Sequence, residues 1–177
     1  MAFQDSKTYQ NLITAYDKEL MSSASYLIYS DIARNAGYIE ISDIYDVIAK
    51  NNKEHARIWL RRINEGKLPT LSDALRQSMQ NEYEMSSIMY QNFTTVAREE
   101  GYDDIAALFS GVANIGYYHS SEFQDILGNV ETNQVFCKPQ ERLWICMQCG
   151  NIMSGICAPD ICPVCAFPQG FYKLYTV

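Results

Sequence analysis

Two Cys-x-x-Cys pairs near the end of the chain place the strongest constraint on its fold. The pairs are Cys146 with Cys149 and Cys162 with Cys165, and twelve residues separate them. Four thiolates brought together in this way can stand at the corners of a tetrahedron around one metal ion. Soft, charged sulfur favours iron or zinc over calcium or magnesium. The spacing therefore predicts a small four-cysteine metal module.

The other two cysteines, Cys137 and Cys157, fall outside this ligand spacing. Their simplest interpretation is as small, half-buried residues. Because four of the six cysteines have metal-ligand spacing, we expect reduced thiols and a cytoplasmic protein. The sequence shows no secretory signal, and no apolar run approaches the roughly 20 residues that a membrane span needs. A net charge of −7 argues against nucleic acid or an anionic membrane as a partner.

The first 127 residues have the periodicity of long amphipathic helices. Apolar residues recur at three- and four-residue steps, and Gly37, Gly66 and Gly101 interrupt the pattern. The predicted helices cover about residues 7–36, 42–65, 70–100 and 103–127, followed by a linker at 128–143 and by turns with short strands. Four helices of this length can bury their apolar stripes by packing side by side as a four-helix bundle.

Parts of the first helical half recur 64 residues later in the second half. The recurring positions are Ala33-Arg34, Gly37-Tyr38, Ile41 and Ile48-Ala49, which return as Ala97-Arg98, Gly101-Tyr102, Ile105 and Val112-Ala113. The same offset relates His55 to His119, and these are the only two histidines in the chain. We therefore expect two helical hairpins of common ancestry, each with one histidine at an equivalent place.

Several segments resemble the rubrerythrin family. They are Lys53-Glu54-His55-Ala56, the run from Ala97 to Tyr102, and the block from Cys146 to Cys165 with its Ala158-Pro159 step. The resemblance implies a mainly α chain, with a ferritin-like four-helix bundle at residues 1–135 and a rubredoxin-like domain with short β-strands at 136–177. It also implies iron in the four-cysteine site and a homodimer or higher homo-oligomer. Zinc suits the same four ligands and would only hold the module folded.

The resemblance also implies metal ligands within the helical bundle. Family members typically bind two irons there, in a site that needs a Glu from each of two helices and Glu-x-x-His from each of the others. Carried over by position, the ligands are Glu19, His55, Glu82 and His119. Tyr26 lies seven residues after Glu19 and matches a tyrosine expected to hydrogen-bond a ligand carboxylate.

Three of the family's carboxylate positions hold other residues, Asn52, Met85 and Gly116. Two ferrous ions bring four positive charges, and two glutamates cannot offset them, so we expect a degraded di-iron site. Three interpretations of the remaining groups stay open. They hold one divalent ion (iron, zinc or manganese), they pair as Glu with protonated His and bind no metal, or they bind a weak second metal at high iron.

Two classes of function are consistent with this pattern. As an enzyme, the protein would be a peroxidase that reduces hydrogen peroxide in oxidative stress defence, with electrons passed through the cysteine-bound iron. As a non-enzymatic protein, it would carry electrons or bind metal, with structural zinc as one form of the four-cysteine site. The lost carboxylates favour a redox protein with an intact electron-transfer centre and a degraded bundle site. The sequence does not identify its electron donor.

Overall fold

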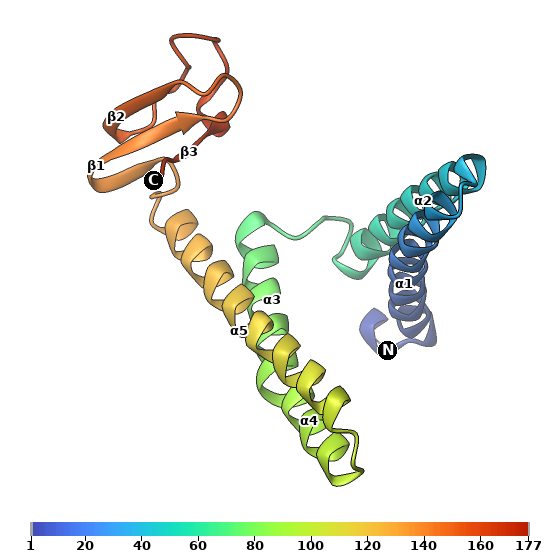
Figure 1. Cartoon of the computed structure of the whole chain (residues 1–177). Helices are drawn as coiled ribbons and strands as arrows, with labels where there is room; N and C mark the ends of the chain where they lie inside the picture. Colours follow the sequence, from blue (N-terminus) through green and yellow to red (C-terminus); the bar gives the residue numbers. More distant parts are fainter. Residues whose placement is uncertain (1, 177) are drawn as a thin grey trace. The chain divides into compact units, whose positions relative to one another are not determined.

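The computed structural model describes residues 2–176 and consists of long helices followed by a small β-sheet (Figure 1). The helical elements are α1 (Lys7–Asn35), α2 (Ile39–Ile63), α3 (Leu71–Glu84), the π-helical turn η2 (Met85–Met89), α4 (Tyr90–Glu99) and α5 (Asp103–Glu131). The strands are β1 (Cys137–Cys146), β2 (Ile152–Cys157) and β3 (Tyr172–Leu174). The chain divides into two compact units, Met1–Pro69 and Thr70–Val177. In the described part of the chain, no helix is long and apolar enough to cross a membrane.

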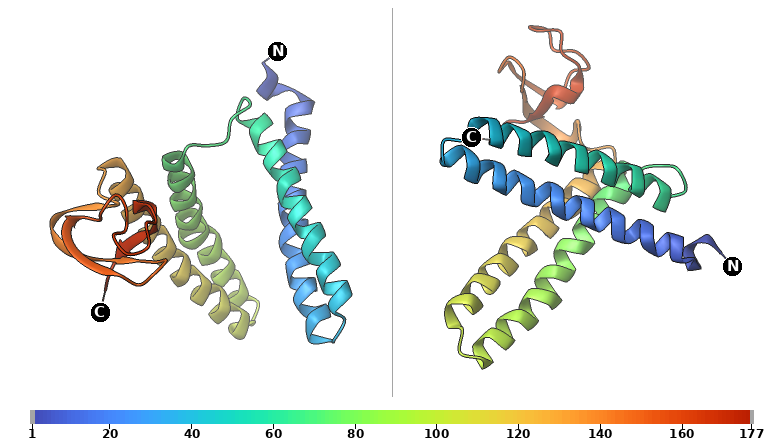
Figure 2. Two further views of the ribbon diagram at one scale, coloured as in Figure 1. Left: turned by 90° about the horizontal axis from the view of Figure 1, so that it is seen from above. Right: turned by 90° about the vertical axis from the view of Figure 1, so that its right-hand side faces the viewer.

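Helices α1 and α2 lie side by side as the first hairpin, joined by small buried residues (Figure 2). Ala33 and Ala49 are buried between them, which lets the two backbones approach closely. The Ser23 hydroxyl donates to the Ala49 carbonyl at 2.8 Å, and the Ser30 and Ser42 hydroxyls lie 2.9 Å apart. These buried hydroxyls therefore have hydrogen-bond partners in place of the water they lose on folding.

The second hairpin pairs α5 with one long helical run made of α3, η2 and α4 (Figure 2). Thr70 caps this run, because its hydroxyl accepts from the Asp73 N–H at 3.2 Å. Across the hairpin, the Ser120 hydroxyl donates to the Met79 carbonyl at 3.0 Å. The π-helical turn Met85–Met89 interrupts the run, and single π turns of this kind are often found at functional sites.

The loops of the two hairpins are built alike, as expected from the internal repeat. Gly37 and Gly101 both have a φ of 84°, a left-handed conformation that glycine adopts readily. The N–H of Tyr38 donates to the carbonyl five residues earlier at 2.9 Å, and the N–H of Tyr102 does the same at 2.8 Å. The 64-residue offset therefore relates backbone geometry as well as residue type.

An aromatic cluster occurs at the same place in both hairpins. The rings of Tyr26, Tyr29 and Tyr45 have centroids 5.8 to 6.2 Å apart, and those of Tyr90, Phe93 and Phe109, each 64 residues later, have centroids 5.5 to 6.2 Å apart. The second cluster keeps this packing with only one hydroxyl. Ring packing, and not the phenol group, is therefore what the two clusters share.

Replacing Tyr29 and Tyr45 together by phenylalanine is expected to leave stability nearly unchanged. The second hairpin already has phenylalanine at both equivalent positions, so the free energy of unfolding should change by less than about 0.5 kcal/mol. Tyr45→Ala, which removes the ring, should cost about 2 kcal/mol. Urea unfolding followed by circular dichroism measures both. Equal losses in the Phe and Ala variants would show that the hydroxyls contribute to stability.

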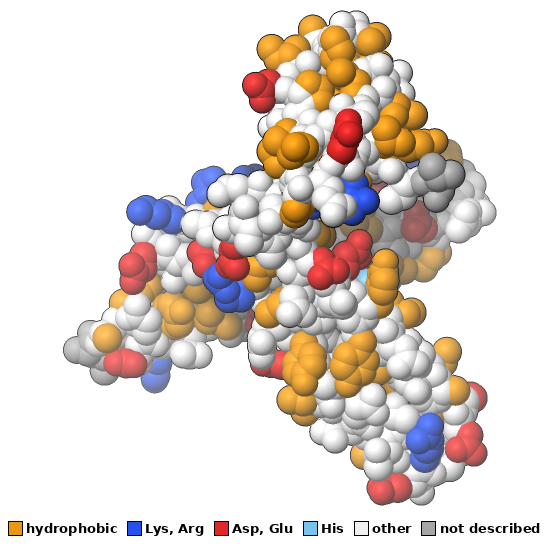
Figure 3. Space-filling view, turned by 90° about the vertical axis from the view of Figure 1, so that its left-hand side faces the viewer, with side chains coloured by type: hydrophobic (Ala, Val, Ile, Leu, Met, Phe, Trp, Pro, Cys, Tyr) orange, Lys and Arg blue, Asp and Glu red, His pale blue; other side chains and the backbone are white. Residues whose placement is uncertain are grey.

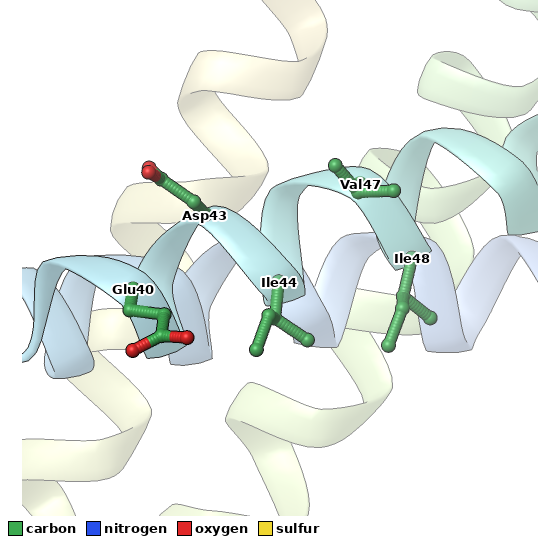
Figure 4. A pocket seen from close by; sticks show the side chains of 5 residues that line it. All are labelled: Glu40, Asp43, Ile44, Val47 and Ile48. Atoms are coloured by element: carbon green, nitrogen blue, oxygen red, sulfur yellow. The ribbon is translucent and has the colours of Figure 1, made fainter.

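Each hairpin also exposes apolar side chains within its own unit. Ile44 and Ile48 point to the same side of α2 and are 52% and 40% exposed (Figure 4). Their equivalents on α5, Leu108 and Val112, are 68% and 43% exposed. The groove along α2 is lined by Glu40, Asp43, Ile44, Val47 and Ile48. Figure 3 shows hydrophobic side chains at the surface of the helices. Such rows are typical of one half of a four-helix bundle.

The strands form a three-stranded antiparallel sheet in the order β2-β1-β3. Trp144 on β1 is 1% exposed, and its indole N–H donates to the Gly155 carbonyl on β2 at 3.0 Å. The buried core of this module consists of Trp144, Cys146, Ala158, Cys162 and Tyr172. Two of its five members are predicted metal ligands, so metal binding and packing of the module depend on the same side chains.

The predicted linker at 128–143 is longer than the connection in the structure. Helix α5 continues to Glu131, because the Gly128 carbonyl accepts from the N–H and the hydroxyl of Thr132 at 3.0 and 2.7 Å. The chain then turns at Asn133, whose φ of 55° is left-handed, a conformation that asparagine tolerates. Strand β1 begins soon after, at Cys137.

Candidate metal sites

Each Cys-x-x-Cys pair folds as a tight turn that ends on a left-handed residue. In the first turn the Gly150 N–H donates to the Cys146 carbonyl at 2.8 Å, and φ of Gly150 is 78°. In the second the Ala166 N–H donates to the Cys162 carbonyl at 2.9 Å, and φ of Ala166 is 59°. Alanine adopts this conformation at a cost of about 1 kcal/mol. Sequence reasoning missed Ala166, because alanine gives no turn signal.

The two turns bring the four predicted cysteine ligands together. Their sulfur atoms all lie within 4.8 Å of one another. The Cys146 and Cys165 sulfurs are 3.7 Å apart, and so are those of Cys149 and Cys162. Sulfurs about 2.3 Å from a central metal ion form a tetrahedron with edges of about 3.8 Å. The four thiols therefore have the size and the donor type of an iron or zinc site.

Tyr172 influences the charge of this site. It lies opposite Cys146 in the sheet and is buried. The Tyr172 side chain lowers the pKa of the Cys162 thiol to about 6, and the pKa of Tyr172 is in turn raised to about 12 by Cys162 and by burial. The surroundings of Cys162 therefore favour the thiolate, which is the form that binds metal.

Cys165 behaves in the opposite way. The backbone N–H of Phe167 lowers its pKa, but burial and the neighbouring thiols outweigh this and raise the pKa of Cys165 to about 12. A metal cation must displace that proton, since thiolate and not thiol is the ligand. Metal affinity is therefore expected to fall as the pH falls.

In the helices, each hairpin contains one pair of the predicted ligands. The His55 ring nitrogen Nδ1 lies 3.4 Å from the Glu19 carboxylate in the first hairpin. His119 Nδ1 lies 3.4 Å from the Glu82 carboxylate in the second. Both pairs are partly exposed within their own units. Tyr26 packs in the aromatic cluster of the first hairpin, and its bond to a ligand carboxylate stays a prediction.

Gly116, where the resemblance predicts a carboxylate, lies against a buried serine. A Cβ atom at Gly116 would overlap the Ser86 hydroxyl oxygen and would lie 3.3 Å from the Glu82 carboxylate. Ser86 is fully buried, and its hydroxyl donates to the Glu82 carbonyl at 2.6 Å. The space for a side chain at position 116 is thus filled from η2. Met85 begins the same π-helical turn.

The two remaining cysteines differ from the sequence interpretation. Cys137 and Cys157 are joined by a disulfide between β1 and β2, instead of standing as separate half-buried residues. Spacing along the chain did not suggest this pairing, because it depends on the register of the two strands. The four ligand cysteines are free of disulfides.

Comparison with known proteins matches both parts of the chain to one family. The sequence model of the rubrerythrin family matches residues 10–127, and that of the rubrerythrin rubredoxin-like domain matches residues 144–173. A rubrerythrin from Clostridium perfringens is 31% identical, over 98% of this chain and 97% of its own length. A rubrerythrin from Nitratidesulfovibrio vulgaris is 30% identical, over 98% and 96%. A solved structure of nigerythrin in a mixed-valence state is 22% identical over 99% of this chain and 92% of its own, with a TM-score of 0.37.

Proposed function

Because the chain belongs to the rubrerythrin family, we propose that it is a non-haem iron redox protein whose four-cysteine site holds iron and transfers electrons. The predicted fold class is confirmed: the chain is mainly α, with a ferritin-like four-helix bundle followed by a rubredoxin-like domain. The observation that carries the proposal is the cluster of four cysteine sulfurs within 4.8 Å of one another, two pairs of which lie 3.7 Å apart. Bound iron would supply a one-electron couple there.

The protein's own groups tune and insulate this site. The Tyr172 hydroxyl stabilises negative charge on Cys162, and buried Trp144 excludes water from one side of the module. Cys149 is exposed, so its sulfur offers an electron donor the closest approach. These features suit a centre that exchanges electrons with an outside partner.

For the helical part, we propose at most one divalent ion, held by Glu19, His55, Glu82 and His119. Two carboxylates balance the charge of one such ion but not of two. The contact between Gly116 and Ser86 supports the loss of a bridging carboxylate, because a side chain at position 116 would overlap the Ser86 hydroxyl where it now lies. The donor set of two carboxylates and two imidazoles suits iron, zinc or manganese.

The test is to measure metal content in protein made with excess iron and to locate each ion by anomalous scattering. We expect one iron per chain at the cysteines and no more than one ion among the helices. Hydrogen peroxide consumption should be no faster than in the matched His55→Ala/His119→Ala variant. Two irons among the helices, with turnover lost in that variant, would instead establish a di-iron peroxidase. Zinc at the cysteines despite excess iron would remove the electron-transfer role.

We also propose that the protein is a homodimer or a higher homo-oligomer. Membership of the rubrerythrin family supports this, since the resemblance implies a homodimer or a higher homo-oligomer. Sedimentation analysis of the purified chain measures its state, and a monomer at micromolar concentration would contradict the proposal.

A further inference from the structure

Cys137 and Cys157 form a single residue pair at one end of the β1–β2 sheet, separated from the other pairs of these strands. They are directly opposite each other, with Cα atoms 4.0 Å apart. The next paired residues are Arg142 and Gly155, five positions further along β1 but only two along β2. The extra residues of β1 bulge out of the ladder, so regular strand pairing does not continue to this residue pair. The disulfide therefore links β2 to the start of β1, where regular strand pairing is interrupted.

This residue pair adjoins the metal module's core on both strands. Phe136, just before Cys137, packs against the core cluster that contains Cys146 and Cys162. Ala158, just after Cys157, belongs to that cluster, and its N–H donates to the Phe136 carbonyl at 2.8 Å. Each cysteine of the disulfide is thus a direct chain neighbour of a residue that packs with the metal ligands.

The two cysteines of the disulfide also differ in how far they are exposed to solvent. Cys157 is exposed, whereas Cys137 is half-buried. An outside thiolate can therefore reach the Cys157 sulfur, and access of this kind is what thiol–disulfide exchange requires. Neither cysteine is part of the four-sulfur cluster, so their oxidation state can change while the metal stays bound.

From these observations we propose that Cys137 and Cys157 are a reversible two-electron redox site. It exchanges electrons with dithiols and disulfides, and its oxidised form slows the loss of metal from the four-cysteine site. This inference goes beyond the proposed electron transfer by iron, since its electrons pass between sulfur atoms and its effect is on metal retention.

The exchange balances in two steps. A thiolate of an outside dithiol attacks the Cys157 sulfur, the bond to Cys137 breaks, and Cys137 leaves as a thiolate that takes up a proton. The second thiol of the dithiol attacks the mixed disulfide and releases Cys157. The dithiol becomes a disulfide, the protein gains two electrons and two protons, and the reverse reaction restores the Cys137–Cys157 bond.

The test uses the full chain loaded with zinc, which has no redox chemistry of its own. The protein is equilibrated with mixtures of reduced and oxidised dithiothreitol, acid-quenched and unfolded, and its free thiols are counted by mass after alkylation. Because the chain has six cysteines, the count should rise from four to six as the mixture becomes more reducing. The matched Cys137→Ser/Cys157→Ser variant should show four in every mixture. A count that stays at four, or one that is six in every mixture, would overturn the reversible site.

The effect on the metal has its own readout. Transfer of zinc to a coloured chelator should be about tenfold slower from the oxidised protein than from the reduced protein. The double-serine variant should release zinc at the faster rate in both conditions. Equal rates for the oxidised and reduced wild-type protein would overturn the link between this redox site and metal retention.

Discussion

Cys162→Ser is expected to abolish stable metal binding at the four-cysteine site. Cys162 is 1% exposed, belongs to the core of the module, and has a pKa lowered to about 6 by the neighbouring Tyr172 side chain. A serine hydroxyl remains protonated and offers a hard, neutral oxygen in place of a soft thiolate. Metal affinity should fall by at least about a hundredfold, and the module should lose its fixed packing, because metal binding and folding are coupled in a domain this small.

Metal content after gel filtration measures the loss, and Trp144 provides a second signal. Its indole is buried against the strand pair, so unfolding of the module should shift its emission towards that of water-exposed tryptophan. Helical circular dichroism should stay almost unchanged. The matched control is Cys157→Ser, which removes a cysteine outside the cluster. It should still bind metal, with the faster release expected when the disulfide is lost. Metal retained in Cys162→Ser at the wild-type level would contradict the assigned ligand set.

The four-cysteine module could be predicted because its signal is local. Each Cys-x-x-Cys turn is closed by hydrogen bonds within five residues, so the pattern of residue types almost determines the geometry. The helices were predictable for a similar reason, since apolar periodicity and Gly37 and Gly101 report on the backbone directly. The internal repeat added more, because two histidines at the same offset indicated equivalent sites in the two hairpins.

Features that depend on contacts between distant residues could not be predicted in this way. The Cys137–Cys157 bond requires the register of β1 against β2, including the bulge between them. The contact of Ser86 with Gly116 joins residues thirty positions apart, on η2 and α5. The sequence showed that Gly116 lacks the expected carboxylate, but nothing in it marked Ser86 as the residue that fills this place.

That contact leads to the second large effect. Gly116→Ala should destabilise the protein when Ser86 is present, but not when Ser86 is replaced by alanine. Alanine is ordinarily about 1 kcal/mol better than glycine inside a helix. At Gly116, however, a Cβ atom would overlap the Ser86 hydroxyl, which is fully buried and bonded to the Glu82 carbonyl. Overpacking of this kind costs about 1–3 kcal/mol, so Gly116→Ala should lower the free energy of unfolding. With Ser86→Ala present, the nearest serine-derived atom would be its Cβ at 3.4 Å, and the same substitution should become neutral or stabilising.

Gly111 on the same helix is the matched control, since a Cβ there would meet nothing within 4 Å. Gly111→Ala should stabilise the protein by about 1 kcal/mol with either residue at position 86. Urea unfolding of the four combinations at positions 116 and 86 gives the coupling energy directly. No coupling would mean that Ser86 moves aside freely. A large coupling would mean that Gly116→Glu alone cannot rebuild a carboxylate ligand, because a smaller residue must also replace Ser86. The hairpin would then depend on glycine at position 116 for its packing, so that the ligand cannot return by a single substitution.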